Sequence, residues 1–256
     1  MSRVTGTRPL APASTPRRPD FSTRDASLIE LMDDPRCDAA LLDATYRDFR
    51  VINALVSGWK DVYRSRIRPR LSATRENTLL DIGSGGGDIA RSLARWAHRD
   101  GYRLSVTGID PDERAYAFAA SRPERPGVRF EAASSRDLVD RGDRFDIVTS
   151  NHLLHHLDDA QRADLLADSE ALADRFVVHS DLERSSVAYR AYQVATWPVA
   201  RRSFIHVDGL LSIRRSFRVD ELARVAPVGW TVCGQKPFRV RLEFDAAARR
   251  RGASRA

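Results

Sequence analysis

Cysteine, methionine and lysine are scarce in this chain of 256 residues, and long apolar runs are absent. The two cysteines, Cys37 and Cys233, form no CxxC pair and have no histidine at metal-ligand spacing, which excludes a cysteine-based zinc site and a disulfide framework. We expect two reduced thiols and the cytoplasm as the default location. No apolar run approaches the roughly 20 residues that a membrane span needs, and the N-terminus has no apolar signal segment. Its arginine-rich, acid-poor start leaves an organelle transit peptide open.

The body of the chain also has no large excess of charge of either sign. The formal net charge is +7, but residues 1–20 contribute +3 and residues 245–256 another +3, which leaves +1 for everything between them. A body so close to neutrality does not present the strong positive field that tracks phosphates. The charge pattern therefore argues against a nucleic-acid partner.

Composition divides the chain into four parts. Residues 1–20 are rich in Pro, Ser, Thr and Arg and are expected to be a disordered basic tail. Residues 21–73 are expected to form an N-terminal helical cap, because apolar residues recur at helical spacing from residue 24 onward and Pro35 interrupts them. The main domain should cover 74–245, followed by a basic C-terminal tail over 246–256. A homodimer is left open.

Short apolar strands alternate with helices from residue 78 onward. This alternation predicts an α/β fold with a doubly wound, mostly parallel seven-stranded sheet. The expected strands are 78–83, 104–110, 128–133, 144–151, 174–181 and two more within 229–244. The helix after the fourth strand should begin at Asp158, with Gln161 completing a capping box.

One insertion interrupts this alternation after the fifth strand. Residues 182–218 are too many for an ordinary connection, and they carry apolar and aromatic side chains. We predict that this insertion is a lid, which closes an apolar pocket together with the N-terminal helices. The aromatic residues in question are Tyr189, Tyr192, Trp197 and Phe204.

The stretch LLDIGSGGGDIA, residues 79–90, places four glycines within five positions after the first expected strand. In a doubly wound sheet this turn lies beside the ligand, and glycines let the backbone approach it closely. A dinucleotide fingerprint needs a small residue where this sequence has Asp88, and an acid at a helix start competes with a pyrophosphate. Asp81, at the strand end, favours an ammonium or sulfonium neighbour. The residues therefore indicate a phosphate-free, cationic ligand.

The segment LDIGSGGGD resembles the first motif of class I S-adenosylmethionine-dependent methyltransferases. The resemblance implies a Rossmann-like methyltransferase fold, S-adenosylmethionine as the cofactor, and Asp81 close to its amino group. Asp110 ends the second strand about 20 residues further on, the spacing of an acid that binds ribose hydroxyls. Where relatives have an acid for the adenine amine, this chain has Ser134 and Ser135, and a hydroxyl accepts such a bond more weakly.

Two further stretches extend the resemblance. FRVINALVSGWKDVYR, residues 49–64, is similar to the helical lead-in of ubiquinone and menaquinone biosynthesis methyltransferases, with Asn53, Ser57 and Gly58 in matching places. FDIVTSNHLLHHLDD, residues 145–159, is similar to the fourth-strand motif, whose end contacts the cofactor. The cofactor-binding residues implied are Asp81, Gly83, Ser84, Gly85, Gly87, Asp110, Pro111, Ser134, Ser135, Asn151 and His152.

Two histidines, His155 and His156, are the candidate catalytic residues. An imidazole with an ordinary pKa near ~6.5 can take a phenol proton at neutral pH. The alternative is that they are loop histidines satisfied by the backbone. No acid cluster predicts a divalent metal site, because Asp158 and Asp159 are explained as a helix cap, so we expect no metal.

Three functions follow from these observations. The first is methyl transfer from S-adenosylmethionine to an oxygen or carbon of a small aromatic, quinone or polyketide-type acceptor, of the kind found in secondary metabolism. The second is an RNA or protein methyltransferase, which the basic tails suggest but for which the chain has no NPPY-type stretch and no catalytic Pro-Cys pair. The third is an S-adenosylmethionine-binding protein that transfers no methyl group.

Overall fold

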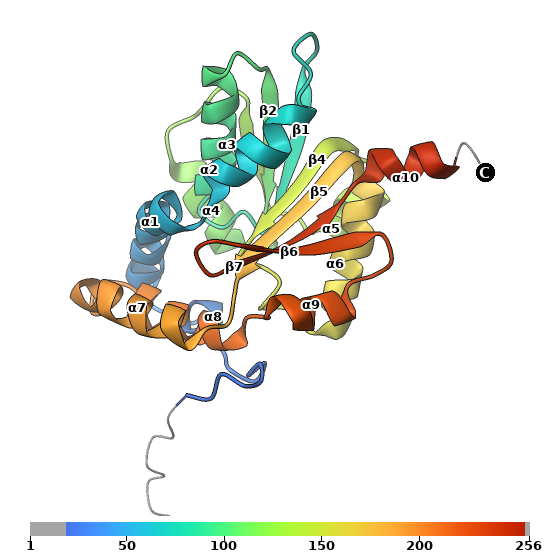
Figure 1. The fold of residues 1–256 in the computed structure, drawn as a ribbon. Coiled ribbons are helices and arrows are strands. Elements are labelled where there is room, and N and C mark those ends of the chain that lie inside the picture. Colours follow the sequence, from blue (N-terminus) through green and yellow to red (C-terminus); the bar gives the residue numbers. More distant parts are fainter. Residues whose placement is uncertain (1–18, 254–256) are drawn as a thin grey trace, which may run out of the picture.

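A twisted seven-stranded sheet runs through the centre of the computed structural model, which describes residues 19–253 (Figure 1). The strand order is β3-β2-β1-β4-β5-β7-β6, and only β7 runs antiparallel to its neighbours. The predicted doubly wound, mostly parallel sheet is therefore confirmed. The strands are β1 Asn77–Ile82, β2 Leu104–Ile109, β3 Val128–Glu131, β4 Phe145–Asn151, β5 Ala173–Leu182, β6 Trp230–Gln235 and β7 Arg239–Phe244.

Helices cover both faces of this sheet, because neighbouring strand residues point to opposite sides. Leu79 packs in a cluster with α2 and α3, whereas Leu80 packs in a second cluster with α5, α6 and α9. Both leucines are fully buried. The helices are α1 Ala39–Val56, α2 Trp59–Val62, α3 Asp88–Arg99, α4 Glu113–Ser121, α5 Ser135–Asp140, α6 Asp159–Leu172, α7 Ser186–Thr196, α8 Ile205–Arg215, α9 Val219–Val225 and α10 Ala246–Ala253.

The capping box predicted for α6 is confirmed. The Asp158 carboxylate accepts from the backbone N–H of Gln161 at 2.8 Å, and the Gln161 side chain accepts from the backbone N–H of Asp158 at 3.0 Å. The two bonds satisfy backbone donors that a helix start leaves free, so local sequence alone sets this boundary.

The prediction that the helical cap begins near residue 24 is wrong. Residues 24–34 form no α-helix and contain only a turn at 26–27 and a 3₁₀ turn at Leu31–Asp33. Their polar groups bond to distant parts of the chain: the N–H groups of Leu31 and Met32 donate to the Asp208 carboxylate at 2.7 and 3.0 Å. The apolar face that the helical spacing implied is not buried throughout either, since Ile29 is 74% exposed. Tertiary hydrogen bonds therefore replaced a local helix. We call residues 19–34 the N-terminal segment.

Both predicted tails extend beyond the described residues, up to residue 18 at one end and from residue 254 at the other. The described start of the C-terminal tail is helical, since α10 runs from Ala246 to Ala253. Its arginines bond to the body: Arg249 pairs with Glu170, and Arg250 lies 3.0 Å from Asp174. Charge that looked free in the sequence is therefore partly paired with acids of α6 and β5.

Helices α7 and α8 make up most of the insertion over 182–218 and lie beside α1 at the lower left of Figure 1. The Tyr192 hydroxyl holds the insertion together by donating to the Ile205 carbonyl at 2.6 Å, whereas the Tyr189 ring packs on Phe21 and Phe204 packs on a cluster that includes residues of α1. Trp197 is 68% exposed. Two bonds join the insertion to α1: the Ser203 hydroxyl donates to Asp48, and the N–H of Phe204 donates to Thr45. Its action as a lid stays a prediction.

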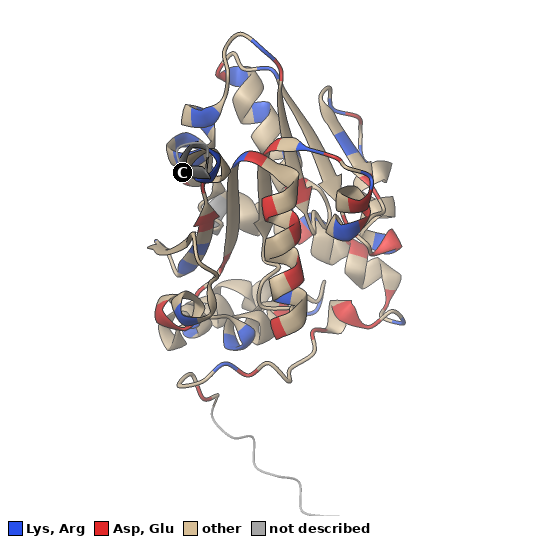
Figure 2. Ribbon diagram, turned by 90° about the vertical axis from the view of Figure 1, so that its right-hand side faces the viewer, with Lys and Arg blue, Asp and Glu red and all other residues tan. Residues whose placement is uncertain are grey.

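The face that carries α6 and α10 mixes the two signs of charge, with acidic residues along α6 (Figure 2). The acids of this helix are Asp159, Asp164, Asp168 and Glu170. Across residues 19–253, no helix combines the length and the apolar composition that a membrane span requires.

Gly87 allows the glycine-rich turn to enter α3. Its φ is +72°, and an added Cβ would lie 2.3 Å from the Phe130 ring. We expect Gly87→Ala to lower the free energy of unfolding by about 2–3 kcal/mol, because left-handed strain and overpacking add. Gly101→Ala is the matched control, because its φ is +83° but no atom lies within 4 Å of the added Cβ. Left-handed strain alone should lower its free energy of unfolding by about 1 kcal/mol. Urea unfolding of both variants measures the difference, and equal losses would contradict the role of Phe130.

Candidate active site

A cavity of about 310 Å³ opens at the carboxyl ends of β1, β2 and β4. This is the point where the strand order reverses, since β1 lies between β2 and β4. Open α/β sheets bind ligands at such a point. The wall is completed by Glu30, Met32 and Asp33 of the N-terminal segment, by Tyr46, Phe49 and Asn53 of α1, and by Ser212 of α8. Segments far apart in the sequence therefore enclose one space.

Most of the predicted cofactor residues line this cavity. Those that do are Asp81, Gly83, Ser84, Gly85, Asp110, Pro111, Asn151 and His152. Asn53, from the lead-in motif, also lines it, whereas Ser57 and Gly58 do not. The predicted contacts with a cofactor themselves stay predictions.

Three predicted cofactor residues do not reach the cavity, and their side chains or backbone serve the fold. Gly87 is the N-cap of α3. The Ser134 hydroxyl caps α5 by bonding to Asp137, and the Ser135 hydroxyl donates to Asp168 at 2.8 Å. The expectation of an adenine contact from the two serines is therefore not supported by the geometry. The sequence did not show α5, whose capping box occupies Ser134.

The glycine-rich turn leaves its backbone bare toward the cavity at Gly85. This residue has φ of +51°, and the nearest atom to an added Cβ would be a ring carbon of Tyr46 at 3.9 Å. A side chain there would project into the open space. The N–H of Gly85 donates to the Asp110 carboxylate at 2.9 Å, which ties the turn after β1 to the end of β2. Only glycine gives both this conformation and this free approach.

Three carboxylates, of the buried Asp81 and of the partly buried Asp88 and Asp110, line the cavity around this turn. Burial raises the pKa of all three, and that of Asp81 reaches about 7, with a smaller upward contribution from the charges of the other two acids. The Thr149 hydroxyl donates to Asp81 at 3.0 Å, and the Asn53 amide donates to Asp88 at 3.0 Å. Within residues 19–253, none of the three carboxylates forms an ion pair. A cationic ligand would therefore offset the free-energy cost of holding these ionised carboxylates away from water without a counter-ion.

His155 is not the free general base that the sequence suggested. Its side chain is 1% exposed, its Nδ1 lies 2.7 Å from Asp181, and its Nε2 lies 3.4 Å from Glu30. Burial alone would lower the pKa of His155, but the charge of Asp181 and then that of Glu30 outweigh it and raise the pKa to about 9. Without a further ligand this imidazole holds its proton at neutral pH. His156, on the same wall, is 25% exposed and lies 3.3 Å from Asp33 through its Nδ1.

His152 directly follows β4 and has φ of +57°, a conformation that costs energy for a residue with a side chain. Its Nε2 accepts from the Arg239 guanidinium, which also donates to Asn151 at 2.6 Å and to Ser180 at 3.0 Å. Burial, followed by the charge of Arg239, lowers the pKa of His152 well below its usual value. His152 is therefore neutral. Burial also lowers the pKa of Arg239, to about 10.

Sequence reasoning missed three charged residues of this region, namely Glu30, Asp181 and Arg239. Asp181 could have been found, because it ends a buried strand at the same edge as Asp81 and Asp110. Glu30 gave no signal beyond an acid within an apolar run. Arg239 lies on the one antiparallel neighbour of β5, so its position depends on a strand pairing that the sequence does not state.

Residues 79–175 match the family model described as a methyltransferase domain. Two similar relatives are ubiquinone biosynthesis O-methyltransferases. That of Rhizobium leguminosarum bv. trifolii is 33% identical over 85 residues, and that of Paramagnetospirillum magneticum is 36% identical over 83 residues. Each match covers 32% of this chain and 31% of the relative. The chain thus matches less than a third of the length of these relatives.

Solved structures of methyltransferases share the fold. The CurJ carbon methyltransferase has a TM-score of 0.58 at 12% identity, covering 84% of this chain and 63% of that one. The plantazolicin methyltransferase BpumL, solved in complex with a pentazolic desmethylPZN analog and SAH, has a TM-score of 0.51 at 12% identity, covering 81% and 95%. A SAM dependent methyltransferase from Aquifex aeolicus has a TM-score of 0.53 at 12% identity, covering 80% and 98%. At these identities the likeness shows the Rossmann-like methyltransferase fold.

Proposed function

This chain contains a class I methyltransferase domain, and from that premise we propose that its cavity binds S-adenosylmethionine for methyl transfer to a small molecule. The acceptor atom is an oxygen or carbon of an aromatic, quinone or polyketide-type compound. The observation that carries the proposal is the group of three carboxylates, one buried and two partly buried, that form no ion pair in residues 19–253 and surround the bare backbone of Gly85. This arrangement suits a ligand that is cationic and carries no phosphate.

The residues present fit this cofactor. Asp81, the most buried acid beside the turn, would pair with the amino group of the methionine part. Asp110 already accepts from the N–H groups of Gly85 and Asp112, and each of its oxygens has a further lone pair for a ribose hydroxyl. When bound, S-adenosylmethionine supplies a methyl group on a positively charged sulfur, which passes to the acceptor atom and leaves S-adenosylhomocysteine.

The chain contributes mainly orientation to such a transfer. Tyr46 and Phe49 of α1 and Met32 of the N-terminal segment place apolar surface over the cavity, where an aromatic acceptor could pack. Holding the acceptor atom in line with the methyl group can supply much of the rate without a strong base. Similarity to two ubiquinone biosynthesis O-methyltransferases supports a small aromatic acceptor.

Incubation of the purified protein with S-adenosylmethionine and a panel of phenols and quinols tests the proposal. We expect S-adenosylhomocysteine to form together with a product heavier by one methyl group. Absence of S-adenosylmethionine binding would overturn the proposal. Binding without turnover on the panel would favour the third function considered, a protein that binds this cofactor and transfers no methyl group.

The pH dependence of cofactor affinity is a separate prediction. The pKa of Asp81 is about 7 in the free protein, mainly because of burial, and a cationic ligand binds the ionised form. Affinity should therefore fall as pH falls through 7, by roughly tenfold between pH 7.5 and pH 6.0. Calorimetric titration with S-adenosylhomocysteine, which has the same amino group, measures it. The Asp81→Asn protein should show a flat profile over this range, and a wild-type profile as flat as that of the variant would contradict the assignment of Asp81.

An RNA or protein acceptor is the alternative function, and one observation favours it. A second hollow of about 580 Å³ lies outside the cavity and is lined by five arginines, which form no ion pair within the described part of the chain. These are Arg50, Arg91, Arg95, Arg122 and Arg125. RNA binding by the body that persists at ~0.2 M salt would support this alternative. Loss of binding at that salt would leave the small-molecule acceptor.

A further inference from the structure

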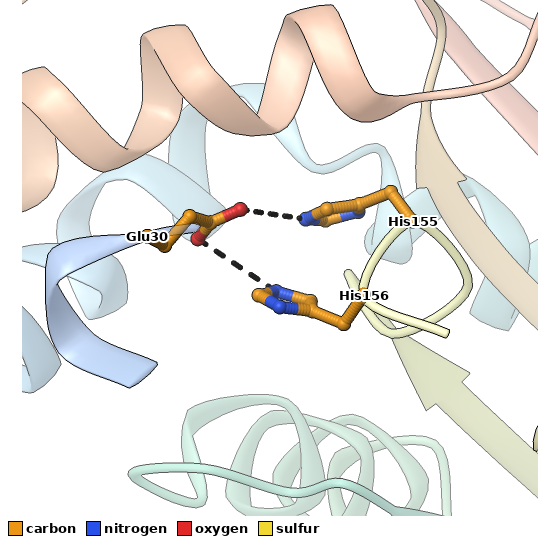
Figure 3. A group of neighbouring side chains, drawn as sticks. All are labelled: Glu30, His155 and His156. Atoms are coloured by element: carbon orange, nitrogen blue, oxygen red, sulfur yellow. Dashed lines mark ion pairs between the residues drawn. The ribbon is translucent and has the colours of Figure 1, made fainter. Parts of the chain in front are cut away.

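Glu30, His155 and His156 meet on one wall of the cavity, although Glu30 lies about 125 residues away in the sequence (Figure 3). The Glu30 carboxylate comes from the N-terminal segment, and the two imidazoles come from the turn after β4. Glu30 Oε1 lies 3.4 Å from His155 Nε2, and Glu30 Oε2 lies 3.7 Å from His156 Nε2. One donor atom from each of the three residues falls within 4.8 Å of the other two.

We propose that these three side chains bind a divalent transition-metal ion of the Zn²⁺ class. Two imidazole nitrogens and a carboxylate oxygen are donors that Zn²⁺ and its neighbours prefer, whereas Mg²⁺ and Ca²⁺ favour oxygen alone. In a tetrahedral Zn²⁺ site the donor atoms lie about 3.3 Å apart, given bonds near 2.0–2.1 Å. One donor atom from each of the three residues lies within 4.8 Å of the other two, so a tetrahedral site requires the donors to close by up to about 1.5 Å.

The other nitrogen of each imidazole is already held by a carboxylate. His155 Nδ1 lies 2.7 Å from Asp181, and His156 Nδ1 lies 3.3 Å from Asp33. Metal-binding histidines are oriented in this way, with Nδ1 on a carboxylate and Nε2 toward the ion. Asp181 also accepts from the backbone N–H of His155 at 2.8 Å, so both the ring and its loop are positioned.

His155 Nε2 is the second observation that points to a ligand. This nitrogen is buried, and it makes no hydrogen bond of acceptable geometry within residues 19–253, although Glu30 is close. A buried polar atom without a hydrogen bond is costly, and it faces the point between the three donors.

The groups around the two imidazoles leave one oxygen of Glu30 freer than the other. The carboxylates of Glu30, Asp33 and Asp181 surround the two imidazoles, and the guanidiniums of Arg215 and Arg24 stand nearby. The Ser212 hydroxyl and Arg215 approach Oε1 of Glu30, at 2.8 and 3.6 Å, which leaves Oε2 the freer oxygen.

Three protein donors leave coordination positions open on the cavity side, as in catalytic rather than structural zinc sites. If the proposed function holds, an oxygen of the acceptor would occupy such a position, and the ion would favour loss of its proton to water. This role rests on the proposed function, whereas binding of the ion does not. It would also explain why the chain needs no free histidine base.

Titration of chelator-treated protein with ZnCl₂ in a calorimeter tests the site. We expect one Zn²⁺ per chain, a rise in Tm on binding, and a visible absorption spectrum when Co²⁺ replaces Zn²⁺. Glu30→Gln and His156→Asn should each weaken Zn²⁺ binding at least about tenfold and remove the Co²⁺ bands. His98→Asn changes an exposed histidine at the end of α3 and should leave binding unchanged. Circular dichroism of each variant reports whether it folds, and His156→Asn, partly exposed, is the safer of the two.

The outcomes separate this inference from the proposed function. Unchanged Zn²⁺ binding in both folded variants, or no stoichiometric binding by the wild type, would overturn the metal site. S-adenosylmethionine binding, measured in parallel in the presence of chelator, should persist in Glu30→Gln. Cofactor binding without Zn²⁺ binding would support the proposed function and overturn the metal site. Zn²⁺ binding without cofactor binding would support the metal site and overturn the proposed function.

Discussion

Replacing Asp81 by Asn is expected to weaken S-adenosylmethionine binding by about 100-fold. Truncating one partner of a buried, hydrogen-bonded charge pair costs about 2–5 kcal/mol, and 1.4 kcal/mol is a factor of ten in Kd. Asp81 is 2% exposed and has no cationic partner within residues 19–253, so the ligand's ammonium would be its counter-ion. Calorimetry or equilibrium dialysis measures the change in Kd.

The same substitution should not destabilise the free protein. The folded state raises the pKa of Asp81 to about 7 from an ordinary value of 3.8, so ionisation of this group opposes folding, increasingly from about pH 4 to pH 7. Asn removes that charge and keeps an oxygen for the Thr149 hydroxyl. Tm at pH 7.5 should therefore be equal or higher, which distinguishes lost affinity from lost fold.

Asp143→Asn is the matched control, because this carboxylate is exposed and, among the described residues, pairs only with the exposed Arg141. It should change neither Kd nor Tm appreciably. A Kd for Asp81→Asn within threefold of the wild-type value would contradict the placement of the ligand's amino group beside Asp81.

Replacing Arg184 by Met is expected to lower the free energy of unfolding by about 3–5 kcal/mol, the range for breaking a buried ion pair. The Arg184 side chain is fully buried, and it joins three parts of the chain. It pairs with Glu221 of α9, donates to the Ser216 carbonyl at 2.8 Å, and donates to the carbonyls of Phe21 and Ser22 at 3.1 and 3.3 Å. Methionine keeps an unbranched apolar stem but has no guanidinium, so it leaves these acceptors unpaired.

The N-terminal segment should loosen in this variant, because two of the bonds of Arg184 end on it. Urea unfolding measures the stability, and limited proteolysis reports cleavage within residues 19–34. Arg214→Met is the control: Arg214 bonds the same segment through Asp25 at 3.0 Å, but both side chains are partly exposed, so about 1 kcal/mol or less should be lost. Similar losses in the two variants would contradict the importance of burial at Arg184.

Local patterns predicted the parts of this protein that depend on neighbouring residues. The alternation of apolar strands and helices predicted the sheet, and Asp158 with Gln161 predicted the start of α6. The glycines and acids at residues 81–88 predicted the turn that lines the cavity, because backbone freedom and strand ends are properties of a few adjacent positions. The same reasoning failed for residues 24–34, where apolar spacing suggested a helix and distant hydrogen-bond partners prevented it.

The sequence alone thus determined the methyltransferase fold and the position of its glycine-rich turn, because both depend on residues that are close together in the chain. Only the tertiary structure decided the protonation state of His155, because its pKa depends on Asp181 and Glu30, which lie 26 and about 125 residues away in the sequence. It likewise decided that Ser134 caps a helix and that Glu30 faces two histidines. Burial and charge proximity are sums over the whole fold, and no local pattern contains them.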